Sequence, residues 1–136
     1  MRVVLDTNVL LAALLTHGTP PERLYAAWRE KRFVLCSCER QLEELRTVTR
    51  RPFFRQRLAP GLAGRLVNDI RKLARMCDPL PSVAASPDPD DDFLLATAQA
   101  AGAEYLVTGD KSGLLAVKKR RGTAIVTART LLARLK

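Results

Sequence analysis

The fold of this protein is indicated by a stretch near the start of the sequence, VVLDTNVLLAALL at residues 3–15. Residues 3–5 are wholly apolar, which is typical of a short strand that is buried on both faces of a parallel sheet. Residues 9–15 are apolar and rich in leucine and alanine, which predicts a buried helix. A strand that leads directly into a helix is the unit from which helix-covered parallel sheets are built, so we expect an α/β fold.

The same alternation of strand and helix continues along the chain. Further short apolar strands are expected at residues 33–36, 105–108 and 123–126. One further helix is expected to begin at Pro20, and another to begin at a cap at Ser37. A third is expected to follow Pro60 and to extend to Cys77. Helices are also expected at residues 90–101, 114–117 and 128–136. Residues 79–89 hold four of the eight prolines and predict an extended connection. The pattern indicates a parallel sheet with helices on both sides.

Length and composition limit the class of protein. The 136 residues fit a single domain, 1–136, and a chain of this length buries roughly 68% of its unfolded surface, enough for a core without disulfides. An apolar content of 47% excludes a disordered chain. No apolar run approaches the ~18 residues of a membrane span, and the first run stops at Asp6, too early for a signal peptide. We therefore expect a cytoplasmic protein that does not enter the membrane.

The cysteines do not predict a metal site. Cys36, Cys38 and Cys77 are an odd number, which is typical of free thiols in a reducing compartment. With His17, the only histidine, they supply the residue types that bind zinc. Their spacing, a CxC pair and one distant cysteine, matches no standard zinc-ligand pattern, so zinc is not expected.

The charged residues are numerous and unevenly distributed. Lysine and arginine number 23 and aspartate and glutamate 14, which gives a net charge of +9. So basic a small protein predicts a polyanionic partner, either nucleic acid or an anionic membrane. Residues 46–75 hold nine basic residues and one acid, whereas residues 78–92 hold five aspartates and no basic residue. This separation indicates that the acids have a role of their own.

Three aspartates are expected at one edge of the sheet. Asp6 follows the first strand, Asp110 follows the strand at residues 105–108, and Asp91 opens the helix that precedes that strand. Ligand sites in open parallel sheets form at the carboxyl ends of the strands, so these side chains are expected to meet there. Each also has a simpler interpretation, as a helix cap for Asp6, a turn residue for Asp110 and a solvated helix start for Asp91.

A glutamate on the helix after Ser37 can join these aspartates. Glu44 lies about 100° around the helix from the centre of its apolar stripe, and Glu43 about 155°. Glu44 therefore sits at the rim of the buried face, whereas Glu43 faces solvent. Glu44 also has a simpler interpretation, as an exposed helix residue.

A cluster of carboxylates requires a compensating cation. Two carboxylates about 4 Å apart repel by about 4 kcal/mol at an effective dielectric constant near 20. Oxygen ligands select hard cations such as Mg²⁺ or Mn²⁺. Such a cation lowers the pKa of a bound water and stabilises the attacking and leaving oxygens of a phosphodiester. Within a basic protein, the cluster therefore suggests hydrolysis of nucleic acid.

Four segments, in this order, resemble those of PIN-domain proteins. They are VVLDTNVLLAALL (3–15), LEELRTVTRRPFF (42–54), DPDDDFLLATAQAAGAEYLVTGDKSGLL (88–115) and AIVTARTLLARL (124–135). The similarity covers essentially the whole chain, and the sequence looks like the branch that comprises toxins of bacterial toxin–antitoxin systems. The resemblance implies a three-layer α/β/α sandwich with a central parallel sheet. It also implies an endoribonuclease that depends on Mg²⁺ or Mn²⁺.

The resemblance further implies which residues form the site. The catalytic acids of the family correspond to Asp6, Glu44, Asp91 and Asp110, with Asp6, Asp91 and Asp110 as metal ligands and with Asn8 and Thr108 as supporting polar residues. The helix-opening position can also fall on Asp90 or Asp92, which flank Asp91. Many relatives carry a further acid where this chain has Ser112 and Gly113, so a second metal site is less strongly implied than the first.

Basic residues and partner proteins complete the expected function. The candidates for contacts with an RNA backbone are Arg50, Arg51, Arg55, Lys118, Lys119, Arg120 and Arg121. With seven aromatic residues in the chain, base stacking is expected to be a minor contribution. The resemblance implies RNA as substrate, a cognate antitoxin as a partner and a homodimer, for which the apolar helices at residues 24–28 or 62–73 are candidate interfaces.

Two other functions stay open at this stage. The first is a non-catalytic module that binds nucleic acid, and the second is a regulatory subunit whose basic face binds an acidic protein. A metal-dependent RNA product would distinguish the nuclease from both.

Overall fold

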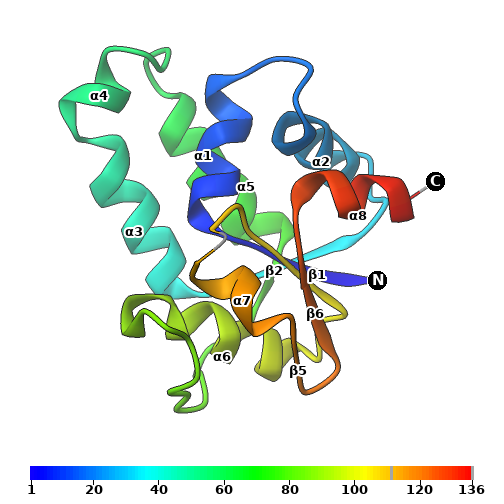
Figure 1. Cartoon of the computed structure of the whole chain (residues 1–136). Coiled ribbons are helices and arrows are strands. Elements are labelled where there is room, and N and C mark those ends of the chain that lie inside the picture. Colours follow the sequence, from blue (N-terminus) through cyan, green and yellow to red (C-terminus); the bar gives the residue numbers. More distant parts are fainter. Residues whose placement is uncertain (111, 136) are drawn as a thin grey trace.

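A sheet lies at the centre of the structure, a computed structural model that describes residues 1–110 and 112–135 (Figure 1). Its strands in this part of the chain are β1 (Arg2–Leu5), β2 (Val34–Ser37), β3 (Arg75–Met76), β4 (Tyr105–Val107), β5 (Lys119–Arg120) and β6 (Thr123–Val126). Their order across the sheet is β3-β2-β1-β4-β6-β5. The pairings are parallel except that of β5 with β6, which is antiparallel.

Helices cover both faces of this sheet (Figure 1). They are α1 (Thr7–Leu15), α2 (Pro20–Arg29), α3 (Glu39–Thr49), α4 (Pro52–Arg55), α5 (Leu62–Leu73), α6 (Asp92–Ala101), α7 (Leu114–Val117) and α8 (Ala128–Arg134). One face packs against α1, α2, α3, α5 and α8, and the other against α6 and α7. The expected three-layer α/β/α sandwich is therefore confirmed. In the described part of the chain, no helix has the length and apolar character needed to cross a membrane.

The side chains of β1 alternate between the two cores. Val3 and Leu5 point into the larger core, and Val4 points into the core beneath α6 and α7. All three are at most 1% exposed. Successive strand residues point to opposite faces, so a strand covered on both sides must be apolar throughout, as this one is.

The helices proposed above as dimer interfaces use their apolar faces internally. Leu24 and Trp28 on α2, and Leu66 and Ile70 on α5, are at most 4% exposed and pack in the larger core. They are therefore unavailable to a second copy of the chain. Leu73, at the end of α5, is the exception and is 56% exposed.

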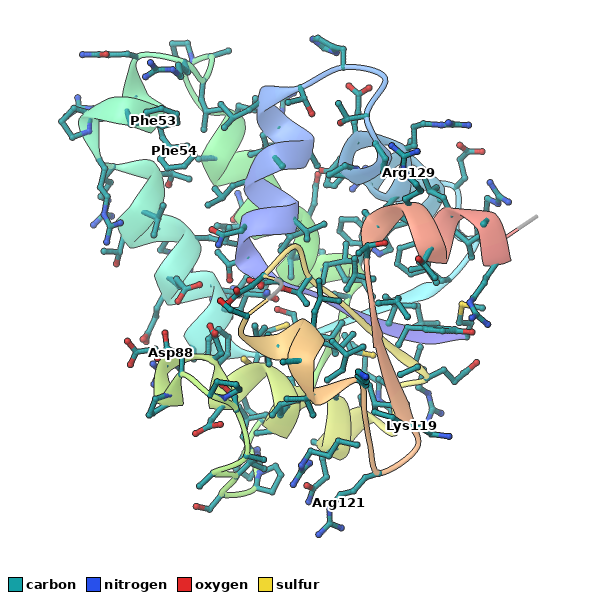
Figure 2. All side chains as sticks on the ribbon, viewed as in Figure 1. Phe53, Phe54, Asp88, Lys119, Arg121 and Arg129 are labelled. Atoms are coloured by element: carbon teal, nitrogen blue, oxygen red, sulfur yellow. The ribbon has the colours of Figure 1, made fainter. Side chains whose placement is uncertain are left out.

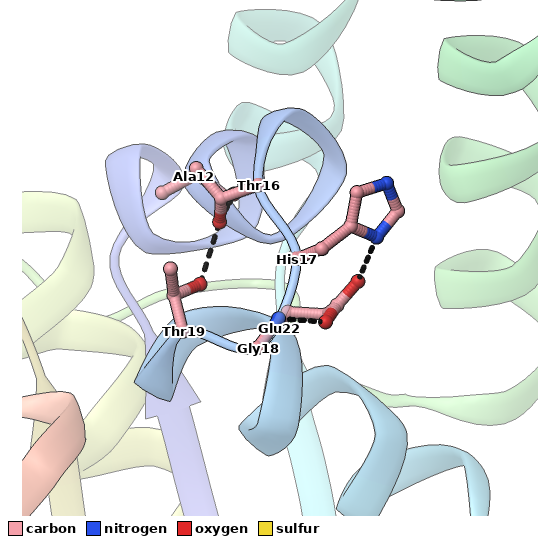
Figure 3. Close-up of polar contacts among 6 residues, drawn as sticks. All are labelled: Ala12, Thr16, His17, Gly18, Thr19 and Glu22. Atoms are coloured by element: carbon pink, nitrogen blue, oxygen red, sulfur yellow. Dashed lines mark hydrogen bonds and ion pairs between the residues drawn. The ribbon is translucent and has the colours of Figure 1, made fainter.

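Polar contacts hold the turn between α1 and α2 (Figure 3). The hydroxyl groups of Thr16 and Thr19 lie 2.5 Å apart. Glu22, in the first turn of α2, accepts a hydrogen bond from the Gly18 backbone N–H at 2.6 Å and contacts His17 Nδ1 at 2.9 Å. These contacts satisfy polar groups where one helix ends and the next begins, so α1 and α2 can pack side by side.

The expected cap at Ser37 is wrong. Ser37 is the last residue of β2, and Cys38 is the N-cap of α3 without a side-chain capping bond. The Ser37 hydroxyl instead donates to Gln41 Oε1 at 2.6 Å. The sequence pattern placed the helix one residue too early because a serine at a strand end and a serine at a helix cap look alike.

The helix expected to run from Pro60 to Cys77 is too long. It ends at Leu73, because Arg75 and Met76 pair with the end of β2 and form β3. The apolar spacing continued through this change, so periodicity alone did not reveal it.

The basic stretch from Lys118 to Arg121 includes a short strand that was not expected. Lys119 and Arg120 form β5 and pair with β6, and Arg121 and Gly122 make the turn with positive φ angles of 49° and 81°. Arg120 is half-buried and donates to Gln99 Oε1 at 2.9 Å.

Other boundaries differ by a few residues. The helix expected at 90–101 begins at Asp92, after a 3₁₀ turn at Pro89–Asp91, and α4 is an additional element. The last helix ends at Arg134, and the expected end at Lys136 lies outside the described residues.

The topology places a crevice between β1 and β4, which are neighbours in the sheet. After β1 the chain leads to β2 on one side, and after β4 it leads to β6 on the other. In open α/β sheets, ligands bind where such connections diverge, at the carboxyl ends of the strands. Asp6 and Thr108 directly follow β1 and β4 and therefore lie at this crevice.

Candidate active site

Asp6 is both a helix cap and a buried carboxylate facing the crevice. Its Oδ1 accepts a hydrogen bond from the Asn8 backbone N–H at 3.3 Å, and its Oδ2 accepts one from Thr108 Oγ1 at 2.8 Å. The residue is 8% exposed. Burial raises the pKa of Asp6, the two hydrogen bonds oppose that rise, and the charges of Glu44 and Asp110 add to it.

Thr108 connects two of the acids. Its hydroxyl donates to Asp6, and its oxygen accepts from the backbone N–H of Asp110 at 3.2 Å. Thr108 is 1% exposed, so both contacts are shielded from water. The residue therefore fixes the position of Asp6 relative to the segment that carries Asp110.

The Asp110 carboxylate is held by the loop that follows it. Its Oδ1 accepts from the Gly113 backbone N–H at 3.0 Å and lies 3.4 Å from the Ser112 hydroxyl. A Cβ atom at position 113 would overlap with Asp110 Oδ2. In this conformation of the loop, the Asp110 carboxylate can therefore adopt its observed position only if residue 113 has no side chain.

Asp91 is the most perturbed of the acids. Burial raises its pKa to about 6, with further contributions from the charges of Asp6, Asp88, Asp110 and Glu44. It stands at the N-cap of α6, and its side chain makes no capping bond. An aspartate whose pKa is raised by surrounding carboxylates is typical of a functional site.

The neighbours of Asp91 have other contacts. Asp92 Oδ1 accepts from the backbone N–H groups of Ala85 and Ser86 at 3.1 and 2.8 Å and so holds the preceding loop. Asp90 is exposed, and its backbone N–H donates to Asp88 Oδ1 at 2.9 Å. The structure therefore brings Asp91, among these adjacent aspartates, to the acidic cluster.

Glu44 reaches the crevice from α3. Together with Asp6, Asn8 and Asp91 it lines an open cleft of about 610 Å³, which we call the acidic cleft. Glu44 is half-buried and Glu43 is exposed, as expected from their positions around the helix, but Glu43 also lines this cleft. Asp110 is outside the lining of this cleft, but its charge raises the pKa of both Asp6 and Asp91.

A buried glutamine supports this edge of the sheet. Gln41 is 1% exposed, and its Nε2 donates to the Leu5 carbonyl at 2.7 Å and lies 3.4 Å from Thr7 Oγ1. Its Oε1 accepts from Ser37. One side chain thus joins the end of β1, the start of α1 and the end of β2 around Asp6.

The donor chemistry of the cluster fits a hard divalent cation. Its carboxylates supply only oxygen ligands, and their negative charges add to the rise in the pKa of Asp91 that burial causes. Within residues 1–110 and 112–135, no three acidic, histidine or cysteine side chains lie close enough together to hold a metal ion directly. The acids therefore suit a divalent cation in their donor type and charge. Water ligands, which Mg²⁺ commonly retains, would have to complete its coordination.

The candidate RNA-binding residues fall in three places. Arg51 lines the acidic cleft, whereas Arg50 and Arg55 line a separate cavity. The stretch from Lys118 to Arg121 lies around β5, at the amino end of β6, and so is remote from the carboxyl ends of the strands (Figure 2). The structure therefore brings one of these seven residues directly to the acids.

The three cysteines lie in one cluster, and the histidine is not among them. His17 lies at the turn between α1 and α2 beside Glu22, whereas Cys36, Cys38 and Cys77 pack in the core beneath α6. Burial raises the pKa of the Cys36 thiol to about 11, so that thiol is protonated at neutral pH.

Further lining residues of the acidic cleft were missed in the sequence. Arg40 and Thr47 lie on the same face of α3 as Glu44, and Phe54 reaches the cleft from α4. Extending that helix face by three and four residues on either side of Glu44 finds Arg40 and Thr47. No local signal identifies Phe54, because α4 itself was not expected.

Comparison with known proteins agrees with this geometry. A family model described as the PIN domain matches residues 2–112. No curated protein and no solved structure matches the chain. The match covers most of the sequence, including Asp6, Glu44, Asp91 and Asp110, and the sandwich and its acidic edge suit a nuclease fold. The protein therefore belongs to the PIN-domain family.

Proposed function

We propose that this protein is an endoribonuclease of the cytoplasm that hydrolyses RNA phosphodiester bonds with Mg²⁺ or Mn²⁺. The observation that supports it most is the raised pKa of Asp91, about 6, which reflects burial and the charges of Asp6, Asp88, Asp110 and Glu44. Structural helix caps do not require such a concentration of like charge, whereas a cation site does.

In this proposal the acids divide into two roles. Asp6, Asp91 and Asp110 hold the cation, directly or through water, and Glu44 orients a water or a second metal. Asp6 and Asp110 come from the ends of neighbouring strands, so their backbones are fixed by the sheet. Ser112 and Gly113 stand where many relatives carry a further acid, so the proposal has one cation site among the remaining four acids.

Thr108 and Asn8 position the acids. The Thr108 hydroxyl and the Asn8 backbone N–H each donate to one oxygen of Asp6, which limits the directions in which its remaining lone pairs point. Both bonds favour the ionised carboxylate and counter the rise in pKa that burial causes. These two hydrogen bonds therefore stabilise the charge state of Asp6 that binds a cation.

A bound divalent cation supplies an activated water and neutralises charge on the scissile phosphate. The chain itself supplies the remaining interactions with the substrate. Arg51, on the rim of the acidic cleft, is placed to contact the phosphate backbone. The excess of basic residues elsewhere attracts the polyanion to the surface over a longer range.

We also propose that the protein is the toxin of a toxin–antitoxin pair, with a cognate antitoxin and a homodimer as its assemblies. The similarity of the four sequence segments to the toxin branch of the family supports this role. The dimer surface is proposed to lie outside the core faces of α2 and α5, since those faces are buried within the chain.

One experiment tests the nuclease. The wild-type protein is incubated with end-labelled single-stranded RNAs, with Mn²⁺ or with excess EDTA, beside Asp6→Asn. We expect cleavage only by the wild type with metal, while Asp6→Asn still binds RNA. Unchanged cleavage by Asp6→Asn, or by the wild type in EDTA, would refute the mechanism.

The same experiment tests the alternative of a non-catalytic module. The observation in its favour is that, among residues 1–110 and 112–135, the acids do not converge closely enough for direct three-ligand coordination. Such a module would bind RNA with a steep dependence on salt and would yield no product with Mn²⁺.

A further inference from the structure

A second cavity lies beside α3, outside the acidic cleft. It has a volume of about 430 Å³ and is lined by Arg46, Thr49, Arg50, Arg55, Ala63, Gly64, Val67 and Asn68, and we call it the arginine cavity. Thr47 and Arg51 line the acidic cleft, while Arg46 and Arg50 line the arginine cavity. The carboxyl-terminal half of α3 therefore separates two sites of opposite charge.

One of the three arginines of this cavity has an acid near it: after Arg71, the charge of Arg46 also lowers the pKa of Glu39. In the described part of the chain, none of the cavity's three guanidinium groups forms an ion pair. Other arginines do, since Arg29 pairs with Asp69 and Arg71 pairs with Glu39. Among the described residues, those that line the cavity include no acid. Three unpaired cations around one hollow make it attractive to an anion from solution.

The polar groups of the cavity suit a phosphate. Guanidinium groups bind phosphate through two parallel N–H donors, which gives geometry as well as charge. The Asn68 side chain adds both donors and an acceptor at the same lining. The Thr49 hydroxyl already donates to the Leu45 carbonyl at 2.6 Å, so its oxygen is left to accept.

The short helix α4 links the arginine cavity to the acidic cleft. Phe54 lines the acidic cleft and Arg55 lines the arginine cavity. On the same helix, Phe53 is 51% exposed, and its ring centroid lies 5.0 Å from that of Phe54 (Figure 2). The Arg57 guanidinium lies 3.8 Å from the Phe53 ring centroid. Aromatic rings and guanidinium planes are the surfaces on which unpaired bases stack.

We propose that the arginine cavity binds a backbone phosphate of single-stranded RNA, and that the strand crosses α4 with an unpaired base against Phe53 and Arg57 before it enters the acidic cleft. That the bound strand is RNA rests on the proposed function, but binding of the strand does not depend on its cleavage. An unpaired strand is required because bases in a duplex already stack on one another.

Binding without cleavage tests this inference. Asp6→Asn serves as the parent protein, in EDTA, and fluorescence anisotropy follows a labelled single-stranded RNA of about 12 nucleotides at several salt concentrations. The triple variant Arg46→Gln, Arg50→Gln, Arg55→Gln is expected to bind at least about tenfold more weakly. The slope of log K against log salt is expected to become shallower by about 0.7 for each phosphate that no longer binds a cationic side chain.

A matched triple variant controls for net charge. Arg65→Gln, Lys72→Gln and Arg129→Gln remove the same charge from exposed positions outside the arginine cavity, and a loss below about threefold is expected. Phe53→Ala is expected to weaken binding by about fivefold or more, whereas Phe53→Trp should retain it. An abasic strand should bind Phe53→Ala and the parent alike.

Circular dichroism checks that each variant is folded. If the triple variant unfolds, the single variants Arg50→Gln and Arg50→Lys replace it. Arg50→Gln is then expected to weaken RNA binding more than Arg50→Lys does. Equal binding by the arginine-cavity variants and the parent would overturn the inference, as would equal losses in both triple variants. Preferential displacement of the RNA by poly-glutamate would assign the cavity to an acidic protein instead. Cleavage assays report separately on the proposed function.

Discussion

The hydroxyl of Thr108 donates a 2.8 Å hydrogen bond to Oδ2 of Asp6, although the two residues are 102 positions apart in the sequence. They meet because β1 and β4 are neighbours in the sheet, with Leu5 opposite Val107. The backbone N–H of Asp6 also donates to the Val107 carbonyl at 2.9 Å, so two hydrogen bonds join Asp6 to the end of β4. The position of Asp6 therefore depends on β4, a strand that lies much later in the sequence.

Removal of the Thr108 hydroxyl is expected to weaken both stability and activity. Thr108→Val keeps the shape but leaves Asp6 Oδ2 and the Asp110 N–H without their partner, at a cost of about 1–3 kcal/mol in the free energy of unfolding. Cleavage is expected to fall by roughly tenfold, because the pKa of Asp6 rises when this bond is lost. Thr108→Ser retains the donor and should behave nearly as the wild type. Urea denaturation and Mn²⁺-dependent cleavage measure the two effects.

Among the adjacent aspartates, Asp91 is expected to carry the activity. Asp91→Asn should lower cleavage by a factor of about 100 or more, the range seen when a charged group acts in the transition state. The matched control is Asp90→Asn, which removes the same charge one residue away at an exposed position and should change the rate less than threefold. If both variants lost cleavage activity to a similar extent, the total negative charge of the loop, and not Asp91 alone, would be responsible for activity.

The ionisation of Asp91 is expected to destabilise the metal-free protein as the pH rises. Its pKa is about 6 in the folded protein, whereas an unperturbed aspartate has a pKa of 3.8, so between these values the folded state binds more protons. The free energy of unfolding therefore decreases as the pH rises through this window. In EDTA, Asp91→Asn should be more stable than the wild type at about pH 7.5 and equal to it below about pH 3.

Thermal unfolding at a series of pH values measures this difference. Mn²⁺ should remove the wild type's disadvantage at the higher pH, because the cation favours the ionised carboxylates. A stability difference that is the same at both ends of the pH range would show that substitution, and not charge, is responsible.

A methyl group at position 113 is expected to displace the Asp110 carboxylate. Gly113→Ala would place a Cβ in the space that Asp110 Oδ2 now occupies, so this exposed side chain must turn away. Cleavage should fall about tenfold, the scale expected for a misplaced catalytic group, with little loss of stability. Gly109→Ala is the control, because a Cβ there meets nothing within 4 Å.

A double variant identifies the cause. If Gly113→Ala acts through Asp110, it should have little further effect in an Asp110→Asn protein. Full additivity of the two substitutions would indicate a separate effect on the loop.

Much of the acidic site could be predicted from the sequence because its residues occupy the ends of regular elements. Asp6 directly follows a wholly apolar strand, and Glu44 lies at a calculable angle on an amphipathic helix. Both positions follow from local periodicity. Local periodicity did not distinguish Asp91 from Asp90 and Asp92. These aspartates are adjacent, and the direction of each side chain depends on the 3₁₀ turn at Pro89–Asp91.

The residues around the site were predicted less well. Phe54 and Arg55 belong to a four-residue helix that has too few residues for a periodic signal, yet they line two different clefts. Gln41 looks like a polar helix residue in the sequence but is 1% exposed in the structure. Its burial depends on three carbonyl and hydroxyl partners that come from separate segments.

The sequence by itself determined the main alternation of strands and helices, although not β3, α4 or β5. It also determined the burial of residues 3–5 and the family to which the chain belongs, since these depend on short-range pattern and composition. Only the tertiary structure decided that Thr108 holds Asp6 and that Asp91 faces the other acids. It also decided that Arg46, Arg50 and Arg55 surround one cavity. These relationships join residues from different elements, and the packing of the sheet and helices fixes their distances.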